Sequence, residues 1–77
     1  MIKLKDFYKI LNYANPVLIK NYVGENLYQN KGRENLLGCK YEYQQEEEFL
    51  AEYGEHNIYD FYYSNRKNFM IIELEEK

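Results

Sequence analysis

Residues 58–74 read IYDFYYSNRKNFMIIEL, and this stretch decides the fold. Two runs rich in aromatic and β-branched residues, 58–63 and 69–74, flank a short polar cluster, which is the pattern of a β-hairpin. Neighbouring side chains of a strand point to opposite faces, and Asp60 and Glu73 mark the faces that meet water. The side chains expected to face the core are Tyr59, Phe61, Tyr63, Met70, Ile72 and Leu74.

The amino-terminal part of the chain predicts a helix and then a first hairpin. Apolar side chains recur at helical spacing over residues 4–13, and the Asn15-Pro16 pair ends this helix because the residue before proline disfavours helical backbone. A strand is expected at 17–22, a turn at 24–26 and a return strand at 27–29. The apolar helix positions are Leu4, Phe7, Leu11 and Ala14.

A second helix is expected at residues 44–53. Glutamates occupy its first turns, where carboxylates interact favourably with the positive end of the helix dipole, and Gly54 stands at the position of a C′ glycine. The preceding residues 33–43 are ambiguous. Within them, 34–37 suit one helical turn closed by a glycine, and 41–43 suit either a short extended segment or the lead-in to the helix.

These elements predict a single α+β domain over residues 1–77, in the order α-β-β-α-β-β. Two short helices are expected on one face of a four-stranded, mainly antiparallel sheet. Since a hairpin alone is marginally stable, helix side chains must close the core against the strands. The residues expected to do so are Phe7, Leu11, Phe49 and Leu50 from the helices and Ile19, Ile72 and Leu74 from the strands.

Composition restricts the class of protein. Cys39 is the single cysteine, so no internal disulfide can form, which favours a reducing cytoplasm. No apolar run approaches the roughly 18 residues that span a bilayer, and no hydrophobic segment follows the charged amino terminus as in a signal peptide. We therefore expect a cytoplasmic protein without membrane contact. The net charge of −3 is uneven, because residues 1–40 carry seven Lys or Arg and three acids, whereas residues 41–77 carry three and ten.

The sequence contains no recognisable motif for catalysis, for a cofactor or for a metal ion. His56, the single histidine, has no partner at ligand spacing and is interpreted as a solvated turn residue. Cys39 is interpreted as a buried or bystander thiol, because Lys40 alone would lower its pKa little. The four glycines form no phosphate-binding pattern, Ser64 is the only serine and there is no threonine. The sequence therefore predicts a protein that is not an enzyme.

The acidic residues between positions 46 and 76 are the feature that most suggests a function. Solvation of the second helix and of the carboxyl-terminal segment is the simplest account of them. The functional alternative is one acidic surface, formed by that helix and the last hairpin and interleaved with tyrosines, that docks on a basic groove in place of nucleic-acid phosphates. The candidate contact residues are Glu46, Glu47, Glu48, Glu52, Tyr59, Asp60 and Tyr62.

Several segments together resemble a known group of proteins. The runs LKDFYKILN at 4–12, VLI at 17–19, LY at 27–28 and FMIIEL at 69–74 resemble small uncharacterised proteins of phages and mobile elements of low-GC Gram-positive bacteria. The resemblance covers both ends of the chain and not residues 44–53. It implies an accessory protein of the anti-CRISPR or anti-defence type, whose partner is a host protein with a basic surface, such as an RNA-guided nuclease. It carries over no functional residue.

Two other functions are consistent with the sequence. One is a homo-oligomeric structural or assembly protein, for example a homodimer, with the tyrosine-rich strand edge as its own interface. The other is a nucleic-acid-binding accessory protein that uses Lys20, Lys31 and Arg33. The negative net charge disfavours this second alternative, because phosphate contacts dominate nucleic-acid affinity.

Overall fold

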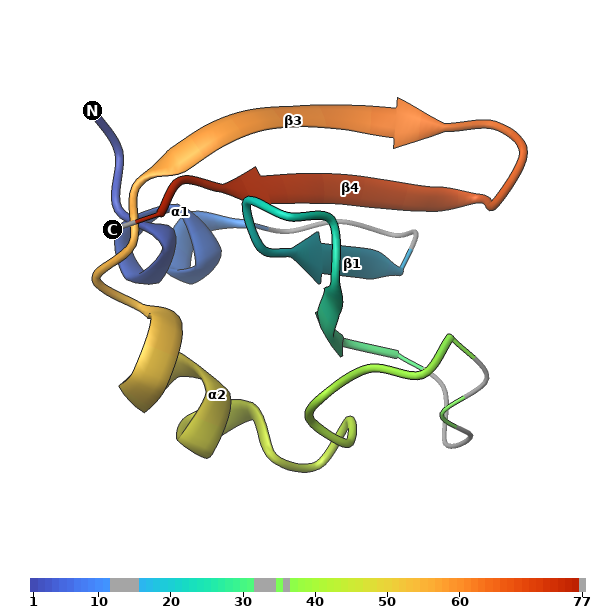
Figure 1. The fold of residues 1–77 in the computed structure, drawn as a ribbon, viewed down its shortest axis with the longest axis horizontal. Helices are drawn as coiled ribbons and strands as arrows, with labels where there is room; N and C mark the ends of the chain where they lie inside the picture. The colour runs from blue at the N-terminus through green and yellow to red at the C-terminus, as the bar shows by residue number, and fades with distance from the viewer. Residues whose placement is uncertain (12–15, 32–34, 36, 77) are drawn as a thin grey trace.

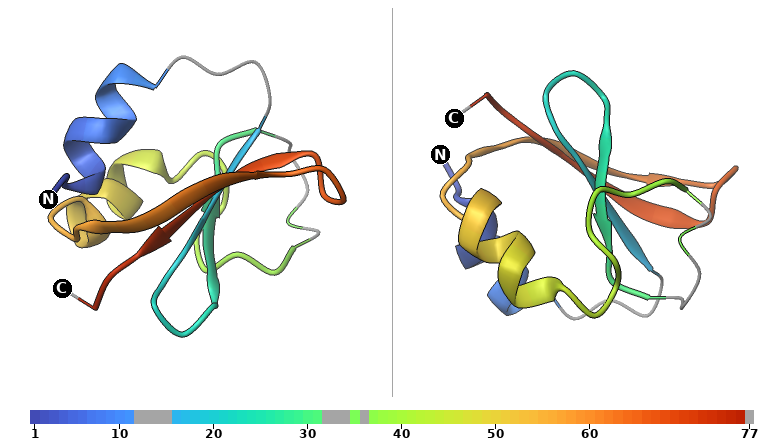
Figure 2. Two further views of the ribbon diagram at one scale, coloured as in Figure 1. Left: turned by 90° about the horizontal axis from the view of Figure 1, so that it is seen from above. Right: turned by 60° about the horizontal axis from the view of Figure 1, so that its bottom comes forward.

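The computed structural model describes residues 1–11, 16–31, 35 and 37–76, and its elements follow the predicted order (Figure 1). The six elements are α1 (Leu4–Ile10), β1 (Val17–Lys20), β2 (Asn26–Gln29), α2 (Glu46–Tyr53), β3 (Ile58–Ser64) and β4 (Phe69–Leu74). Both helices lie on the same face of the sheet (Figure 2). The predicted α+β class and the α-β-β-α-β-β order are confirmed.

The four strands form one sheet in the order β2-β1-β4-β3. The two sequence hairpins, β1–β2 and β3–β4, are antiparallel, and a parallel pairing of β1 with β4 joins them into a mixed sheet. The apolar strands β1 and β4 are therefore central. The β3 strand, which carries most of the aromatic residues of the hairpin, lies at an edge.

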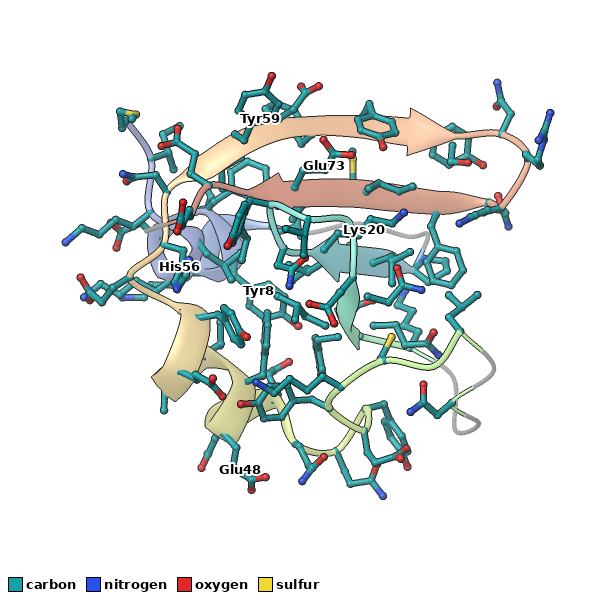
Figure 3. All side chains as sticks on the ribbon, viewed as in Figure 1. Tyr8, Lys20, Glu48, His56, Tyr59 and Glu73 are labelled. Atoms are coloured by element: carbon teal, nitrogen blue, oxygen red, sulfur yellow. The ribbon has the colours of Figure 1, made fainter. Side chains whose placement is uncertain are left out.

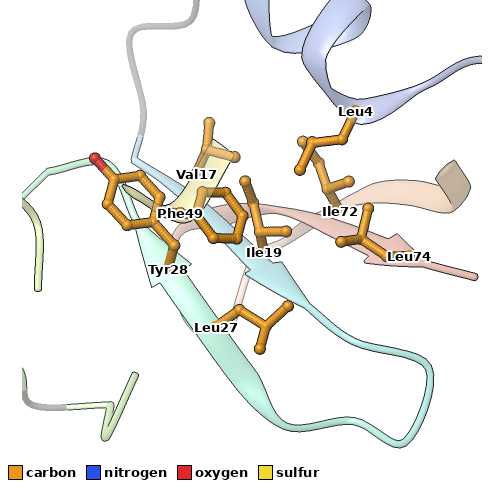
Figure 4. Close-up of a cluster of buried hydrophobic side chains, with 8 residues drawn as sticks. All are labelled: Leu4, Val17, Ile19, Leu27, Tyr28, Phe49, Ile72 and Leu74. Atoms are coloured by element: carbon orange, nitrogen blue, oxygen red, sulfur yellow. The ribbon is translucent and has the colours of Figure 1, made fainter. Parts of the chain in front are cut away.

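The main core lies between the helix-covered face of the sheet and the two helices (Figure 4). Phe49 from α2 is fully buried, and its ring stacks on Tyr28 with centroids 4.9 Å apart. Leu4 from α1 is fully buried and lies near Ile72 and Leu74 of β4. The residues predicted to close the core do so, with Phe7, Leu11 and Leu50 partly buried against it. The buried members of the core are Leu4, Val17, Ile19, Leu27, Tyr28, Phe49, Ile72 and Leu74.

The central strands are buried on both faces. Leu18 of β1 and Ile71 of β4 are neighbours across the parallel ladder and point away from the helices, yet both are buried. Gln29, opposite Leu18 on β2, is buried as well. Burial on both faces is typical of parallel strand pairs, and it explains the continuous apolar runs at 17–19 and 69–72.

The predicted inward set of the last hairpin is correct for β4 and wrong for β3. Ile72 and Leu74 are fully buried, whereas Tyr59, Phe61 and Tyr63 are 72%, 51% and 39% exposed. Phe61 does lie opposite Ile72, on the helix side of the sheet, but β3 is an edge strand. An irregularity in the β3–β4 register between residues 58 and 60 changes the direction of the side chains at the start of the strand. The alternation of side chains along the strand therefore predicts the face of the sheet on which Phe61 lies, but not how far the β3 side chains are buried.

Gly54 ends α2 for a different reason from the one expected. Its backbone is right-handed, with φ −60°, and does not have the left-handed conformation of a C′ glycine. A Cβ atom there would collide with the carbonyl oxygen of Leu50 and lie 3.2 Å from the Cβ of Lys5. The Lys5 N–H donates to the Gly54 carbonyl at 2.9 Å. Glycine is thus favoured because a Cβ would clash with the backbone of α2's own last turn and would crowd Lys5 of α1.

Other boundaries differ from the predictions by a few residues. The β1 strand ends at Lys20, because Asn21 starts a turn in which its side chain accepts the N–H groups of Val23 and Glu25. The α2 helix begins at Glu46 and not at residue 44. The first helix ends at Ile10 and the backbone of Leu11 is extended, whereas the predicted helical residues 12–13 lie outside the described residues. The predicted turn at 34–37 lies partly outside them.

Candidate partner-binding surface

The predicted contact residues fall into two groups on opposite sides of the molecule. Glu48 of α2 and Tyr59 of β3 lie at opposite ends of the view in Figure 3. The sheet and the core lie between these two groups. The structure therefore brings Tyr59, Asp60 and Tyr62 together on one strand and places the α2 glutamates elsewhere. The single acidic surface expected from the sequence is not formed.

Two of the α2 glutamates attach the helix to the rest of the chain. Glu46 accepts a 2.7 Å hydrogen bond from the hydroxyl of Tyr8. Burial, and then this bond to a carboxylate, raise the pKa of the Tyr8 phenol. Glu52 forms an ion pair with Lys40 at 3.1 Å and accepts a hydrogen bond from the hydroxyl of Tyr41. Glu46 and Glu52 thus have a structural role, because they bond α2 to other segments of the chain.

The uneven charge of the sequence is partly cancelled by ion pairs between its two halves. The carboxylate of Glu55, just after α2, accepts a hydrogen bond from the Lys3 Nζ at 2.7 Å and also forms an ion pair with Lys5. Hydrogen bonds from these two ammonium groups lower the pKa of the Glu55 carboxyl to about 2. Lys3 and Lys5 therefore neutralise an acid close to the helices, and not the acids of the last hairpin.

The exposed aromatic residues gather on β3. We call Tyr59, Phe61, Tyr62 and Tyr63 the aromatic edge; Tyr62 is 40% exposed, and the exposures of the others are given above. Their polar atoms are largely held in place, because the Tyr62 hydroxyl donates to Glu73 at 2.8 Å and the Tyr63 hydroxyl donates to Asn68. The bond to Glu73 raises the pKa of the Tyr62 phenol. Such anchored tyrosines lose little conformational entropy on binding.

The backbone of β3 is less open than its side chains. The Ile58 N–H donates to the Ile2 carbonyl at 2.8 Å, so the amino-terminal segment covers the start of the strand. The Phe61 N–H donates to the carboxylate of Asp60 at 2.8 Å. The irregular register and the charged residue protect this edge against pairing with another strand. The aromatic edge therefore offers side chains, and little free backbone, to a partner.

A cleft opens beside the start of β3, between the β1–β2 turn and the end of β4. Its volume is about 520 Å³, and we call it the acidic cleft. The turn and the chain after β4 project from the same side of the molecule in both views of Figure 2. The residues that line it are Asn21, Tyr22, Val23, Gly24, Tyr59, Glu73, Leu74, Glu75 and Glu76. Tyr59 belongs both to this cleft and to the aromatic edge.

His56 and Cys39 have structural surroundings. His56 is half-buried: its Nδ1 is hydrogen-bonded to the Glu75 carbonyl at 3.0 Å, and its ring packs 5.0 Å from that of Tyr53. It links the segment after β4 to α2, so the expectation of a solvated turn histidine is wrong. Cys39 is buried as predicted, and burial raises the pKa of its thiol, which lowers its reactivity.

Among the described residues, no three His, Cys, Asp or Glu side chains lie close enough to hold a metal ion. In the same part of the chain, neither helix has the length and apolarity that a membrane crossing requires. A comparison with models of protein families finds no match, and comparisons with curated protein sequences and with solved structures find none that is significant.

The structure adds residues that sequence reasoning missed. Sequence reasoning expects Phe61 and Tyr63 in the core, and it does not single out Tyr22 and Val23, which are 58% and 60% exposed on the β1–β2 turn. A hydrophobic residue in a turn next to glycine was the available signal for such an exposed wall.

The three cations predicted as an alternative nucleic-acid site are located as follows. Lys20 ends β1 beside Glu73 in the parallel register, Lys31 is exposed just after β2, and Arg33 lies outside the described residues.

Proposed function

We propose that the protein is a non-enzymatic binding protein that docks on another protein through the aromatic edge. The observation that carries this proposal is the placement of four exposed aromatic side chains on consecutive or alternate positions of one edge strand. Aromatic residues are enriched at protein interfaces, and tyrosine is among the residues that dominate binding energy. A small domain gains nothing in stability from leaving such rings in water.

The charge around the aromatic edge favours a basic partner. Asp60 and Glu73 face each other across the β3–β4 ladder, and Glu75 and Glu76 follow β4. The ion pairs among the described residues involve other acids, Glu52 and Glu55. Carboxylates without a paired cation attract a positively charged surface and speed its association.

The partner class that fits this chemistry is a protein with a basic groove for nucleic acid. The resemblance to phage accessory proteins supports the more specific form of the proposal, an inhibitor of a host defence complex such as an RNA-guided nuclease. In this form the carboxylates of the hairpin take the place of phosphates, and the aromatic edge supplies the anchors. The α2 glutamates, on the far side, are not part of the contact.

The test compares two double variants as baits in a bacterial lysate, with bound proteins quantified by mass spectrometry. Phe61→Ala with Tyr63→Ala removes two anchors, and Glu47→Gln with Glu48→Gln removes two exposed charges from α2. We expect a basic protein that the wild type and the helix variant retain equally and the strand variant loses. Retention that is unchanged in the strand variant, or lost in the helix variant, would overturn the proposal.

The specific form has its own assay. A purified Cas9-type nuclease loaded with guide RNA is incubated with the protein before target DNA is added. Inhibition of cleavage by the wild type but not by Phe61→Ala with Tyr63→Ala supports an anti-defence role. A captured partner with no nucleic-acid groove contradicts that role and leaves the general proposal intact.

Self-association through the same strand is the second candidate, because β3 is an edge strand. The covered N–H groups of Ile58 and Phe61 leave a short open edge, which favours a monomer. Light scattering coupled to size-exclusion chromatography measures the mass directly. A stable dimer that Phe61→Ala dissociates would favour the second candidate over the first.

A further inference from the structure

We propose that the acidic cleft binds the side chain of an arginine presented by the partner protein. This inference rests on the proposed function and names the chemistry that one end of the surface recognises. It stands on three features of the cleft: its aromatic walls, its carboxylates, and its continuity with the aromatic edge through Tyr59.

The walls of the cleft are apolar and already formed. Tyr22 and Val23 of the β1–β2 turn and Tyr59 of β3 line the cleft, and all three are more than half exposed. The turn that carries Tyr22 and Val23 is fixed by the side chain of Asn21, which accepts the Val23 N–H at 3.1 Å and the Glu25 N–H at 2.8 Å. Such walls suit the apolar stem of a long side chain, and tyrosine faces attract a cation.

The lining of the cleft carries negative charge. Glu73, Glu75 and Glu76 line the cleft, and none of the described residues that line it is basic. The carboxylate of Glu73 is oriented by the Tyr62 hydroxyl at 2.8 Å. Lys20 is the neighbour of Glu73 in the parallel ladder, but no ion pair joins them among the described residues. The cleft is therefore complementary to a cation and repels an anion.

The segment after β4 is held in place. The Glu75 N–H donates to the Asn57 carbonyl at 2.9 Å, and the Glu75 carbonyl is hydrogen-bonded to His56 Nδ1. The β1–β2 turn and the segment after β4 are thus both preorganised, so little ordering opposes binding.

Arginine fits this set of groups better than lysine does. Its planar guanidinium stacks on aromatic faces and donates two parallel hydrogen bonds to a carboxylate, whereas the lysine ammonium is a compact and strongly hydrated charge. Because Tyr59 lies in both the cleft and the aromatic edge, an arginine that enters the cleft extends naturally from a segment lying along β3. This continuity favours a protein segment over a free amine.

The experiment is a titration of the ¹⁵N-labelled protein with the peptide acetyl-Gly-Arg-Gly-amide at low salt. We expect shift changes confined to residues 21–24, 59 and 73–76, with a Kd of about 1 mM, the weak range near −4 kcal/mol. The peptide with citrulline, a neutral isostere of arginine, is expected to bind roughly tenfold more weakly. Equal binding of the citrulline or the lysine peptide, or shifts centred on α2, would overturn the inference.

Variants complete the test. Glu73→Gln and Tyr59→Ala are expected to weaken the arginine peptide at least threefold, a loss of about 0.65 kcal/mol each. Glu48→Gln on the far side is the matched control and is expected to change nothing. Glu76→Gln, at an exposed position after β4, keeps the test valid if Glu73→Gln perturbs the hairpin.

The two proposals can fail separately. If the lysate partner is lost with Phe61→Ala and Tyr63→Ala but is retained unchanged by Glu73→Gln with Glu76→Gln, the inference about the acidic cleft is wrong and the proposed function holds. If the arginine peptide binds as described and the lysate partner is indifferent to the aromatic edge, the cleft holds and the proposed function is wrong.

Discussion

The loss of stability on replacing Phe49 or Phe61 by alanine distinguishes a core position from a position on the proposed contact surface. Phe49 is fully buried and touches the rings of Tyr28, Tyr41 and Tyr53. Phe→Ala at such a site costs about 3–5 kcal/mol. A domain of 77 residues has about 4–12 kcal/mol of total stability, so Phe49→Ala removes between about a quarter and all of it.

Phe61 is half exposed, so its truncation costs far less. Full burial of such a ring contributes about 1.5–3 kcal/mol, of which roughly half applies here. The pair with Phe7, whose centroid is 5.3 Å away, adds about 0.5–1.5 kcal/mol. We therefore expect Phe61→Ala to lower the free energy of unfolding by about 1.3–3 kcal/mol.

Urea unfolding followed by far-ultraviolet circular dichroism measures both values. Since the chain has no tryptophan, tyrosine fluorescence is the second probe, and agreement of the two checks two-state behaviour. Phe49→Leu provides a measurable core variant if Phe49→Ala is unfolded in water. A loss from Phe61→Ala as large as that from Phe49→Ala would refute the reasoning, because it would place the aromatic edge inside the core.

Three further predictions concern the framework. Tyr28→Phe removes the 2.8 Å hydrogen bond to the Tyr43 carbonyl and should lower the free energy of unfolding by about 1 kcal/mol in urea titrations. The depressed pKa of Glu55 stabilises the fold above about pH 4.5, and this contribution is lost as the pH falls toward 2. Glu55→Gln should therefore flatten the loss of thermal stability in that window, and an unchanged profile contradicts the ion pairs. Gly54→Ala should lower the Tm by several degrees because its Cβ meets the Leu50 carbonyl, and a raised Tm contradicts this clash.

The hairpin could be read from the sequence because its signals are local. Alternation and a polar turn fix both strands of 58–74 and even the face on which Phe61 lies. Burial depends on the neighbours of each strand in the sheet, and the parallel pairing of β1 with β4 has no local signal. That pairing made β4 central and left β3 at the edge, which reversed the expected burial of Tyr59, Phe61 and Tyr63.

The candidate site was predictable only in its chemistry. The sequence shows that acids and tyrosines are abundant in the second half, but not which acids are neutralised. The contact between Lys3 and Glu55 joins residues 52 positions apart, and it removes an acid that sequence spacing would count as free. The wall formed by Tyr22 and Val23 likewise depends on where the β1–β2 turn lies relative to β4.

The most direct test of the central claim is the affinity of one purified partner for two variants of the chain. The claim is that the aromatic edge, and not the acidic helix, makes the contact. For Phe61→Ala with Tyr63→Ala we predict at least a tenfold rise in Kd, about 1.4 kcal/mol. For Glu47→Gln with Glu48→Gln we predict less than about a twofold change, the size expected of charges outside the contact. A partner that responds to the helix variant and ignores the strand variant contradicts the claim.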